Sequence, residues 1–158
     1  MAEKSLNKKK ISICRYCHLL YKKNLVGAAG GNVSCRHKNS IMVTAGGRSL
    51  RDISNPDIIQ VDMEGSPIVK DNAARPSKEL RLHLNIYRAR KDVNAVIHVH
   101  PVYATAFAAA GNTVPMITVS SRLKLGKIPL VGCADPGSRE LADMVYEAAA
   151  QNKDIKAI

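Results

Sequence analysis

Short β-type runs are grouped between helical segments along this chain, and this grouping constrains the fold more than any other feature. Runs at 41–44, 58–61 and 67–69 follow one another without an intervening helix. A further run at 95–100 follows a helical segment that begins near 76. A doubly wound parallel sheet needs a helix after each strand. The order of segments therefore predicts a mixed α/β domain and does not indicate such a parallel sheet.

Apolar periodicity and end signals predict four helices around these runs. We expect them over 4–25, from 76 onward, from 101 to about 110, and from 136 to 151. Two more short strands are expected at 128–131 and 155–158. The length of 158 residues suits a single domain, taken here as 1–158.

Composition and charge limit the class of protein. Apolar residues make up 46% of the chain, which excludes disorder as the dominant state. We see neither an apolar run of membrane-spanning length nor a secretory signal, so we expect a cytoplasmic protein without a membrane partner. The net charge of +11 favours an anionic partner. With no Trp and one Phe, stacking surfaces for nucleic acid are scarce, and we expect no nucleic-acid partner.

One cysteine pair has two interpretations. Cys14, Cys17 and His18 match the C-x-x-C-H pattern of covalent haem attachment. The same segment reads as an amphipathic helix, in which free cysteines behave as small buried apolar side chains. The absence of an export signal favours the helix, with reduced thiols.

The strongest local signal for chemistry is the His98-Val99-His100 run. Residues i and i+2 of a strand point to one face, so the two imidazoles converge as neighbouring metal ligands do. Structural histidines on a half-exposed strand are the alternative. Glu79 begins the helix that leads into this strand, so it is a candidate third ligand or base. As a first-turn acid it can also simply stabilise its helix.

Glycine pairs offer backbone amides to an anion. Gly46 and Gly47, the loop at 27–32, and Ser77 at a helix start can form an anion cradle. Ordinary turn chemistry is the alternative for each pair. The spacing matches no nucleotide-binding motif, so no nucleotide is implied.

Three ordered motifs resemble the class II aldolase/adducin family. They are Gly31-Asn32-Val33-Ser34, then Pro76-Ser77-Lys78-Glu79 with Leu82-His83 and Ile86-Tyr87, then His98-Val99-His100-Pro101 with Tyr103-Ala104-Thr105-Ala106. The pattern is most similar to the L-fuculose-phosphate aldolase-like enzymes. The resemblance runs from about residue 8 to the C-terminus.

The resemblance implies a fold, an assembly and a site. The fold is a three-layer α/β/α arrangement around a mostly antiparallel sheet, and the assembly is a homotetramer with sites between subunits. Zn²⁺ or another divalent metal is implied at His98 and His100, with Glu79 as the catalytic acid/base and as a candidate ligand. The positions that hold the substrate phosphate are Asn32, Gly46, Gly47, Ser77 and Lys78.

The implied activity is metal-dependent aldol cleavage. A small ketose phosphate is split to dihydroxyacetone phosphate and an aldehyde through a metal-stabilised enediolate. The same site implies, as alternatives, an epimerase, a decarboxylase or the methylthioribulose-phosphate dehydratase. A different class is the non-enzymatic adducin-like interaction module, in which the metal-binding residues are lost.

This chain departs from the family pattern at two places. The third histidine ligand of the family follows a strand near 156–158, and no histidine follows that strand here. Either the domain is truncated at its C-terminus, which we expect, or two histidines and Glu79 hold the metal. A tyrosine that the fuculose enzymes use as a proton donor is absent from 116–120.

Overall fold

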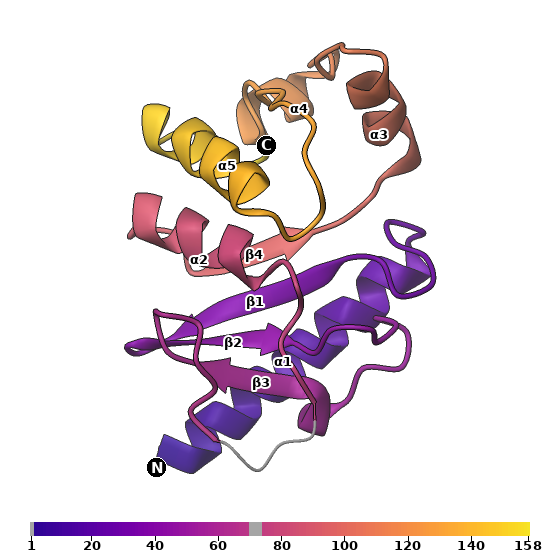
Figure 1. The fold of residues 1–158 in the computed structure, drawn as a ribbon. Helices are drawn as coiled ribbons and strands as arrows, with labels where there is room; N and C mark the ends of the chain where they lie inside the picture. Colours follow the sequence, from indigo (N-terminus) through magenta and orange to yellow (C-terminus); the bar gives the residue numbers. More distant parts are fainter. Residues whose placement is uncertain (1, 70–73) are drawn as a thin grey trace.

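A four-stranded antiparallel sheet lies at the centre of the molecule, with helices on both of its faces (Figure 1). The structure is a computed structural model that describes residues 2–69 and 74–158. Helix α1 covers one face, and helices α2 and α5 lie on the other side, with α5 packed on α2. This arrangement confirms the expected α/β fold with a mostly antiparallel sheet.

The elements follow one another in a simple order. They are α1 (Ala2–Lys22), β1 (Asn32–His37), β2 (Ser40–Thr44), a 3₁₀ turn (Asn55–Asp57), β3 (Ile58–Val61), α2 (Leu80–Ala89), β4 (Ala95–His98), α3 (Val102–Ala109), α4 (Val119–Lys124) and α5 (Arg139–Gln151). In the part of the chain that the structure describes, no helix is both long and apolar enough to cross a bilayer.

Strand β1 is central to the sheet, although the sequence does not predict it. The strand order is β3-β2-β1-β4, so β1 pairs with β2 on one side and with β4 on the other. Val33 and Cys35 of β1 pack with the core under α1. The alternate residues Ser34 and Arg36 bond to α2 and the residues that follow it. Because one face of β1 is polar and yet covered, its sequence lacks an apolar run.

One apolar core lies on each face of the sheet. Successive side chains of a strand point to opposite faces, so neighbouring residues enter different cores. Met42 and Ile58 belong to the core under α1. Their neighbours along the strands, Ile41, Val43 and Ile59, belong to the core under α2. The sheet is therefore buried on both faces.

Several expected elements differ from the structure. The run at 67–69 forms only an isolated bridge between Val61 and Pro67. The runs at 128–131 and 155–158 are not strands, because no described strand lies beside them to complete a ladder. The short helix α4 was not expected.

Helix boundaries also differ. Helix α1 ends at Lys22, before the expected residue 25. Helix α2 begins at Leu80 because Pro76 is held in a bridge with Ala45 of the strand edge. Helix α5 begins at Arg139. The preceding residue, Ser138, caps this helix, because its side chain accepts a hydrogen bond from a backbone N–H of the first helical turn.

The C-x-x-C-H segment is part of α1 and faces the core. Cys17 is fully buried and Cys14 is 8% exposed. Burial raises the pKa of the Cys17 thiol to about 12, so this thiol stays protonated and unreactive. His18 bonds through Nε2 to the carbonyl oxygen of Ile53. The structure therefore agrees with the buried-helix interpretation and not with haem attachment.

Arg36 ties β1 to the C-terminal end of α2. Its guanidinium donates to the carbonyl oxygens of Tyr87, Arg90 and Val93 over 2.7, 3.2 and 3.0 Å. The same group lies 4.7 Å from the centre of the Tyr87 ring. A cation at the C-terminal end of a helix stabilises the carbonyl groups that lie there.

Replacing Arg36 with alanine is expected to lower the free energy of unfolding by about 2–4 kcal/mol, since several charge-assisted hydrogen bonds are lost at a partly buried site. Urea denaturation measures the change. Arg81→Ala is the matched control, because Arg81 lies on α2 with an exposed side chain. Equal losses in the two variants would contradict this role for Arg36.

Candidate metal and phosphate site

His98 and His100 lie at the end of β4 and converge, as the sequence predicts. The strand ends at His98, which is paired with Asn32 of β1. The backbone N–H of His100 donates to the carbonyl oxygen of Leu25 over 2.8 Å, which holds the chain beyond the strand. The two Nε2 atoms lie 2.7 Å apart, and the rings meet at 75°. The imidazoles thus face one common point.

The glycine-rich loop that follows α1 lies against this histidine pair. A Cβ on Gly30 would lie 3.4 Å from Nδ1 of His100. Gly31 has φ +78°, and a Cβ there would lie 2.9 Å from the carbonyl oxygen of His98. Only glycine allows this close approach with a left-handed backbone.

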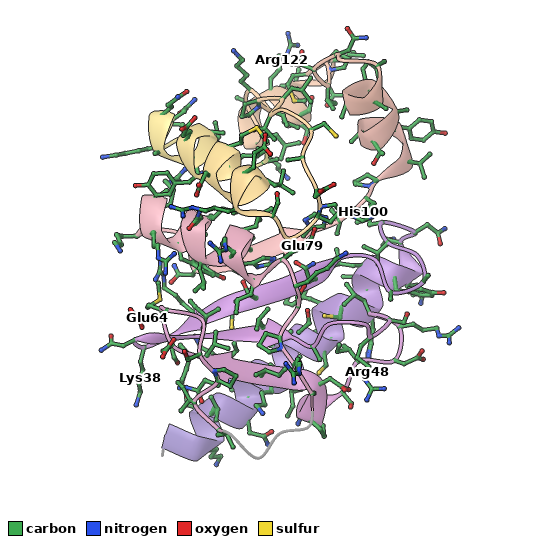
Figure 2. All side chains as sticks on the ribbon, in the orientation of Figure 1. Lys38, Arg48, Glu64, Glu79, His100 and Arg122 are labelled. Atoms are coloured by element: carbon green, nitrogen blue, oxygen red, sulfur yellow. The ribbon has the colours of Figure 1, made fainter. Side chains whose placement is uncertain are left out.

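Glu79 lies beside the histidines, as expected, at the N-terminal cap of α2. Its Oε2 is 3.6 Å from Nδ1 of His98, and its side chain is 12% exposed. Burial lowers the pKa of His98, the proximity of His100 lowers it further, and Glu79 opposes both. Figure 2 shows Glu79 and His100 where α2 and β4 meet the C-terminal half of the molecule.

The described residues contain no group of three or more His, Cys, Asp or Glu side chains arranged to hold a metal ion. Glu79 approaches Nδ1 of His98, whereas the point that the two histidines share is at their Nε2 atoms. The other histidines, His18, His37 and His83, do not join this point. Two imidazoles with a neighbouring carboxylate therefore make up the site.

The candidate phosphate residues of two loops come together. A Cβ on Gly46 would lie 3.4 Å from Cα of Ser77 and 3.8 Å from the nitrogen of Lys78. The Gly46 N–H is already bonded to the carbonyl oxygen of Arg75, so this amide is not a free anion donor. The Ser77 hydroxyl accepts from the N–H of Glu79 and keeps its own hydrogen to donate.

Gly47 and Lys78 are exposed residues of these two loops. Gly47 has φ +70° and nothing within 4 Å of where its Cβ would lie. Lys78 is exposed, and its backbone packs against Gly137 in the loop before α5. An anion would meet an uncrowded backbone and a mobile ammonium group here.

Asn32 contacts Glu79, the residue that directly follows the second of these loops. Its side chain is buried, and Nδ2 donates to Glu79 Oε2 over 2.6 Å. Oδ1 of Asn32 bonds to Nε2 of His83, a histidine to which the sequence assigns no role. The four-residue spacing of His83 and Tyr87, which places both on one face of α2, is the signal that could have indicated a shared role.

His83 is expected to make stability depend on pH. Burial lowers its pKa from 6.5 to about 3, with a smaller contribution from His98. In the unfolded chain this histidine takes up a proton below about pH 6.5, whereas the folded protein does so only near 3. Between pH 7.5 and 5 it should therefore cost the fold about 2 kcal/mol.

Urea denaturation at both pH values, on the wild type and His83→Gln, measures this difference. We expect a smaller loss of unfolding free energy at pH 5 in the variant. The lowered pKa values of His37 and His98 belong to both proteins, so their contributions cancel. The same pH dependence in both proteins would show that His83 is not held neutral.

A protein family, several curated proteins and several solved structures are similar to this chain. The model of the Class II Aldolase and Adducin N-terminal domain matches residues 11–158. An L-fuculose phosphate aldolase from Methanococcus maripaludis is 38% identical over 131 residues, which are 83% of this chain and 70% of that protein. A 5-methylthioribulose-1-phosphate/5-deoxyribulose-1-phosphate aldolase from Escherichia coli is 33% identical over 95% of this chain and 68% of its own length.

Further relatives widen the range of reactions and support the fold. A 3-oxo-tetronate 4-phosphate decarboxylase from Cupriavidus necator is 30% identical over 90% of this chain and 67% of its own length. A solved structure of an L-fuculose 1-phosphate aldolase superposes with a TM-score of 0.81 at 27% identity, covering 89% of this chain and 66% of that one. With a family model matched over most of its length, this chain belongs to the class II aldolase and adducin family.

Proposed function

We propose that this protein is a metal-dependent aldehyde-lyase that cleaves a small ketose phosphate to dihydroxyacetone phosphate and an aldehyde. The relatives named as aldolases support a lyase that acts in sugar-phosphate metabolism. The observation that carries the finer proposal is the convergence of His98 and His100, with Nε2 atoms 2.7 Å apart and the Glu79 carboxylate next to them.

The two imidazoles fit a divalent metal, and we infer Zn²⁺ as the favoured ion. Their Nε2 atoms face one point, and imidazole is a preferred ligand of zinc. His98 and His100 would hold the ion, with Glu79 as a candidate third ligand. A divalent ion bound there supplies Lewis-acid polarisation of the substrate oxygens.

Glu79 is the proposed acid/base. Its carboxylate is mostly withdrawn from water, and Asn32 holds one of its oxygens in place. A carboxylate in such a position can take a proton from a substrate carbon and return it. Asn32 remains a candidate contact for the substrate through the second hydrogen of its amide.

The substrate phosphate is proposed to bind between the loops at 46–47 and 77–78. The Ser77 hydroxyl, the Lys78 ammonium and the Gly47 amide would donate to its oxygens, while Gly46 allows the loops to approach. Holding the phosphate fixes the distance between the reacting carbons and Glu79.

The test is a screen of ketose 1-phosphates with the metal-loaded protein, with dihydroxyacetone phosphate release as the readout. Release from at least one of them is the expected result. No release from any substrate, with metal bound, would refute the aldolase proposal.

Decarboxylation of an oxo-acid phosphate is the second candidate, favoured by the decarboxylase among the relatives, and carbon dioxide release would reveal it. An epimerase or dehydratase would convert the sugar phosphate without either product.

Metal analysis separates the enzyme from an adducin-like interaction module. We expect about one divalent ion per chain after dialysis, since both histidines of the pair are present. Protein without a divalent metal would favour the interaction module. The cytoplasmic location and the absence of nucleic-acid partners remain predictions from the sequence.

A homotetramer is proposed from the exposed apolar side chains of α3 and α4. Helix α3 is apolar along nearly its whole length, yet it has no buried residue. Val102, Tyr103 and Leu123 are 72%, 85% and 82% exposed. Apolar surface of this kind marks protein interfaces, and the family resemblance implies further copies of the same chain as the partner. Light scattering should give four times the chain mass, and Val102→Asp with Leu123→Asp should lower it.

A further inference from the structure

Five polar side chains form an unbroken chain of hydrogen bonds that ends at the proposed base, Glu79. The Tyr87 hydroxyl lies 2.8 Å from Oγ of Ser34. That Oγ lies 2.6 Å from Nδ1 of His83. Nε2 of His83 bonds to Oδ1 of Asn32, whose Nδ2 donates to Glu79 over 2.6 Å. The chain thereby connects α2 and β1 to the site.

This hydrogen-bonded chain is closed to water up to Glu79. Ser34, His83 and Tyr87 are fully buried, and Asn32 is 4% exposed. In the described part of the molecule, every buried side-chain nitrogen and oxygen has a partner. With water excluded, each group can change its hydrogen-bonding role only if its neighbour changes too.

The direction of each hydrogen bond follows from what each group can donate. Oδ1 of Asn32 only accepts, so Nε2 of His83 must carry the hydrogen. His83 is fully buried, and the side chains that it bonds to, Ser34 and Asn32, are neutral, so a charged ring is disfavoured. Nδ1 therefore carries no hydrogen and accepts from the Ser34 hydroxyl. The Ser34 oxygen then accepts from Tyr87. All the donors along this chain point toward Glu79.

We propose that His83 is a positioning residue that acts through Asn32: its Nε2–H tautomer holds the Asn32 amide with the NH₂ group toward Glu79. This inference rests on the proposed function, in which Glu79 is the acid/base. If the amide turned over, its oxygen would face a carboxylate that only accepts, and His83 would lose its acceptor. Both hydrogen bonds would be lost in a buried site. His83 thus fixes the carboxylate against which the substrate must align.

Nitrogen NMR tests the tautomer without any activity measurement. In a two-bond ¹⁵N–¹H spectrum of the labelled wild type at pH 7.5, the neutral tautomers of histidine have different cross-peak patterns. We expect the Nε2–H pattern for His83. The Nδ1–H pattern, or a charged ring, would overturn the proposal. His83→Gln assigns the signal, and alanine variants of the other four histidines assign it by elimination if that protein fails to fold.

Kinetics test whether His83 acts through Asn32. His83→Leu should lower kcat by about 10–100-fold with little change in KM, as misplacement of a catalytic group does. In an Asn32→Ala background the same change should give no further loss. His83→Gln, with an amide that can donate near the Nε2 position, should retain most of kcat. An equal loss in both backgrounds would overturn the proposal.

The two proposals fail in different ways. A metal-loaded wild type that releases no dihydroxyacetone phosphate refutes the proposed function, whereas the NMR tautomer still decides how His83 holds Asn32. A wild type that is active, with the wrong tautomer or with additive kinetic losses, refutes only the role of His83.

Discussion

Replacing either His98 or His100 with alanine should remove the bound metal and the activity together. The two Nε2 atoms converge within 2.7 Å, and among the described residues no third side chain completes a metal-binding group. One remaining imidazole, even with the Glu79 carboxylate as a second ligand, is too few ligands for a stable site. Metal content after dialysis and dihydroxyacetone phosphate release are the two measurements, and both should fall to background.

A matched histidine variant controls for this experiment. His18 is exposed on α1, and its side chain bonds to the carbonyl oxygen of Ile53. His18→Ala should keep both the metal and the activity. Full metal content in His98→Ala or His100→Ala would place the ion elsewhere and refute the proposed site.

Replacing Glu79 with glutamine should lower kcat by about 10²–10⁴-fold, which is the usual contribution of a general acid or base. Glutamine has nearly the same size and still offers an oxygen to Nδ2 of Asn32, so the fold should remain intact. Steady-state kinetics on the metal-loaded protein, together with its thermal unfolding, measure both effects. Nearly normal turnover would show that Glu79 is not the acid/base.

Glu64→Gln is the control for this second experiment. Glu64 is an exposed residue of a turn far from Glu79, as Figure 2 shows, and its loss should leave kcat unchanged. Metal content of Glu79→Gln also separates two roles of the carboxylate. Retained metal with lost turnover indicates a base, whereas loss of both indicates a ligand.

The strands β2, β3 and β4 and the helices α1, α2, α3 and α5 were predictable from local patterns, whereas α4 was not. The run at 58–61 became β3 because alternate residues such as Ile58 and Ile59 enter opposite cores. The apolar run at 128–131 has no strand beside it among the described residues and is irregular. A strand needs a partner, and a local pattern does not contain one.

The candidate site also has a part that the sequence predicts and a part that depends on the fold. Three residues, Glu79, His98 and His100, were proposed from local spacing and resemblance, and the structure brings them together. The approach of Gly46 to Ser77 and the commitment of the Gly46 amide to Arg75 depend on two loops that are far apart in sequence. No spacing rule reaches across that separation.

The chemical groups of this protein are evident from local sequence: a histidine pair two residues apart, an acid near a helix start, and glycines where loops must approach closely. These features are local, because backbone geometry places residues i and i+2, or i and i+4, without help from the rest of the chain. The place of β1 in the middle of the sheet and the contact of its polar face with α2 come from long-range packing. That contact joins Tyr87, Ser34, His83 and Asn32 to Glu79. It depends on burial, since only the exclusion of water makes each of these groups rely on its neighbour.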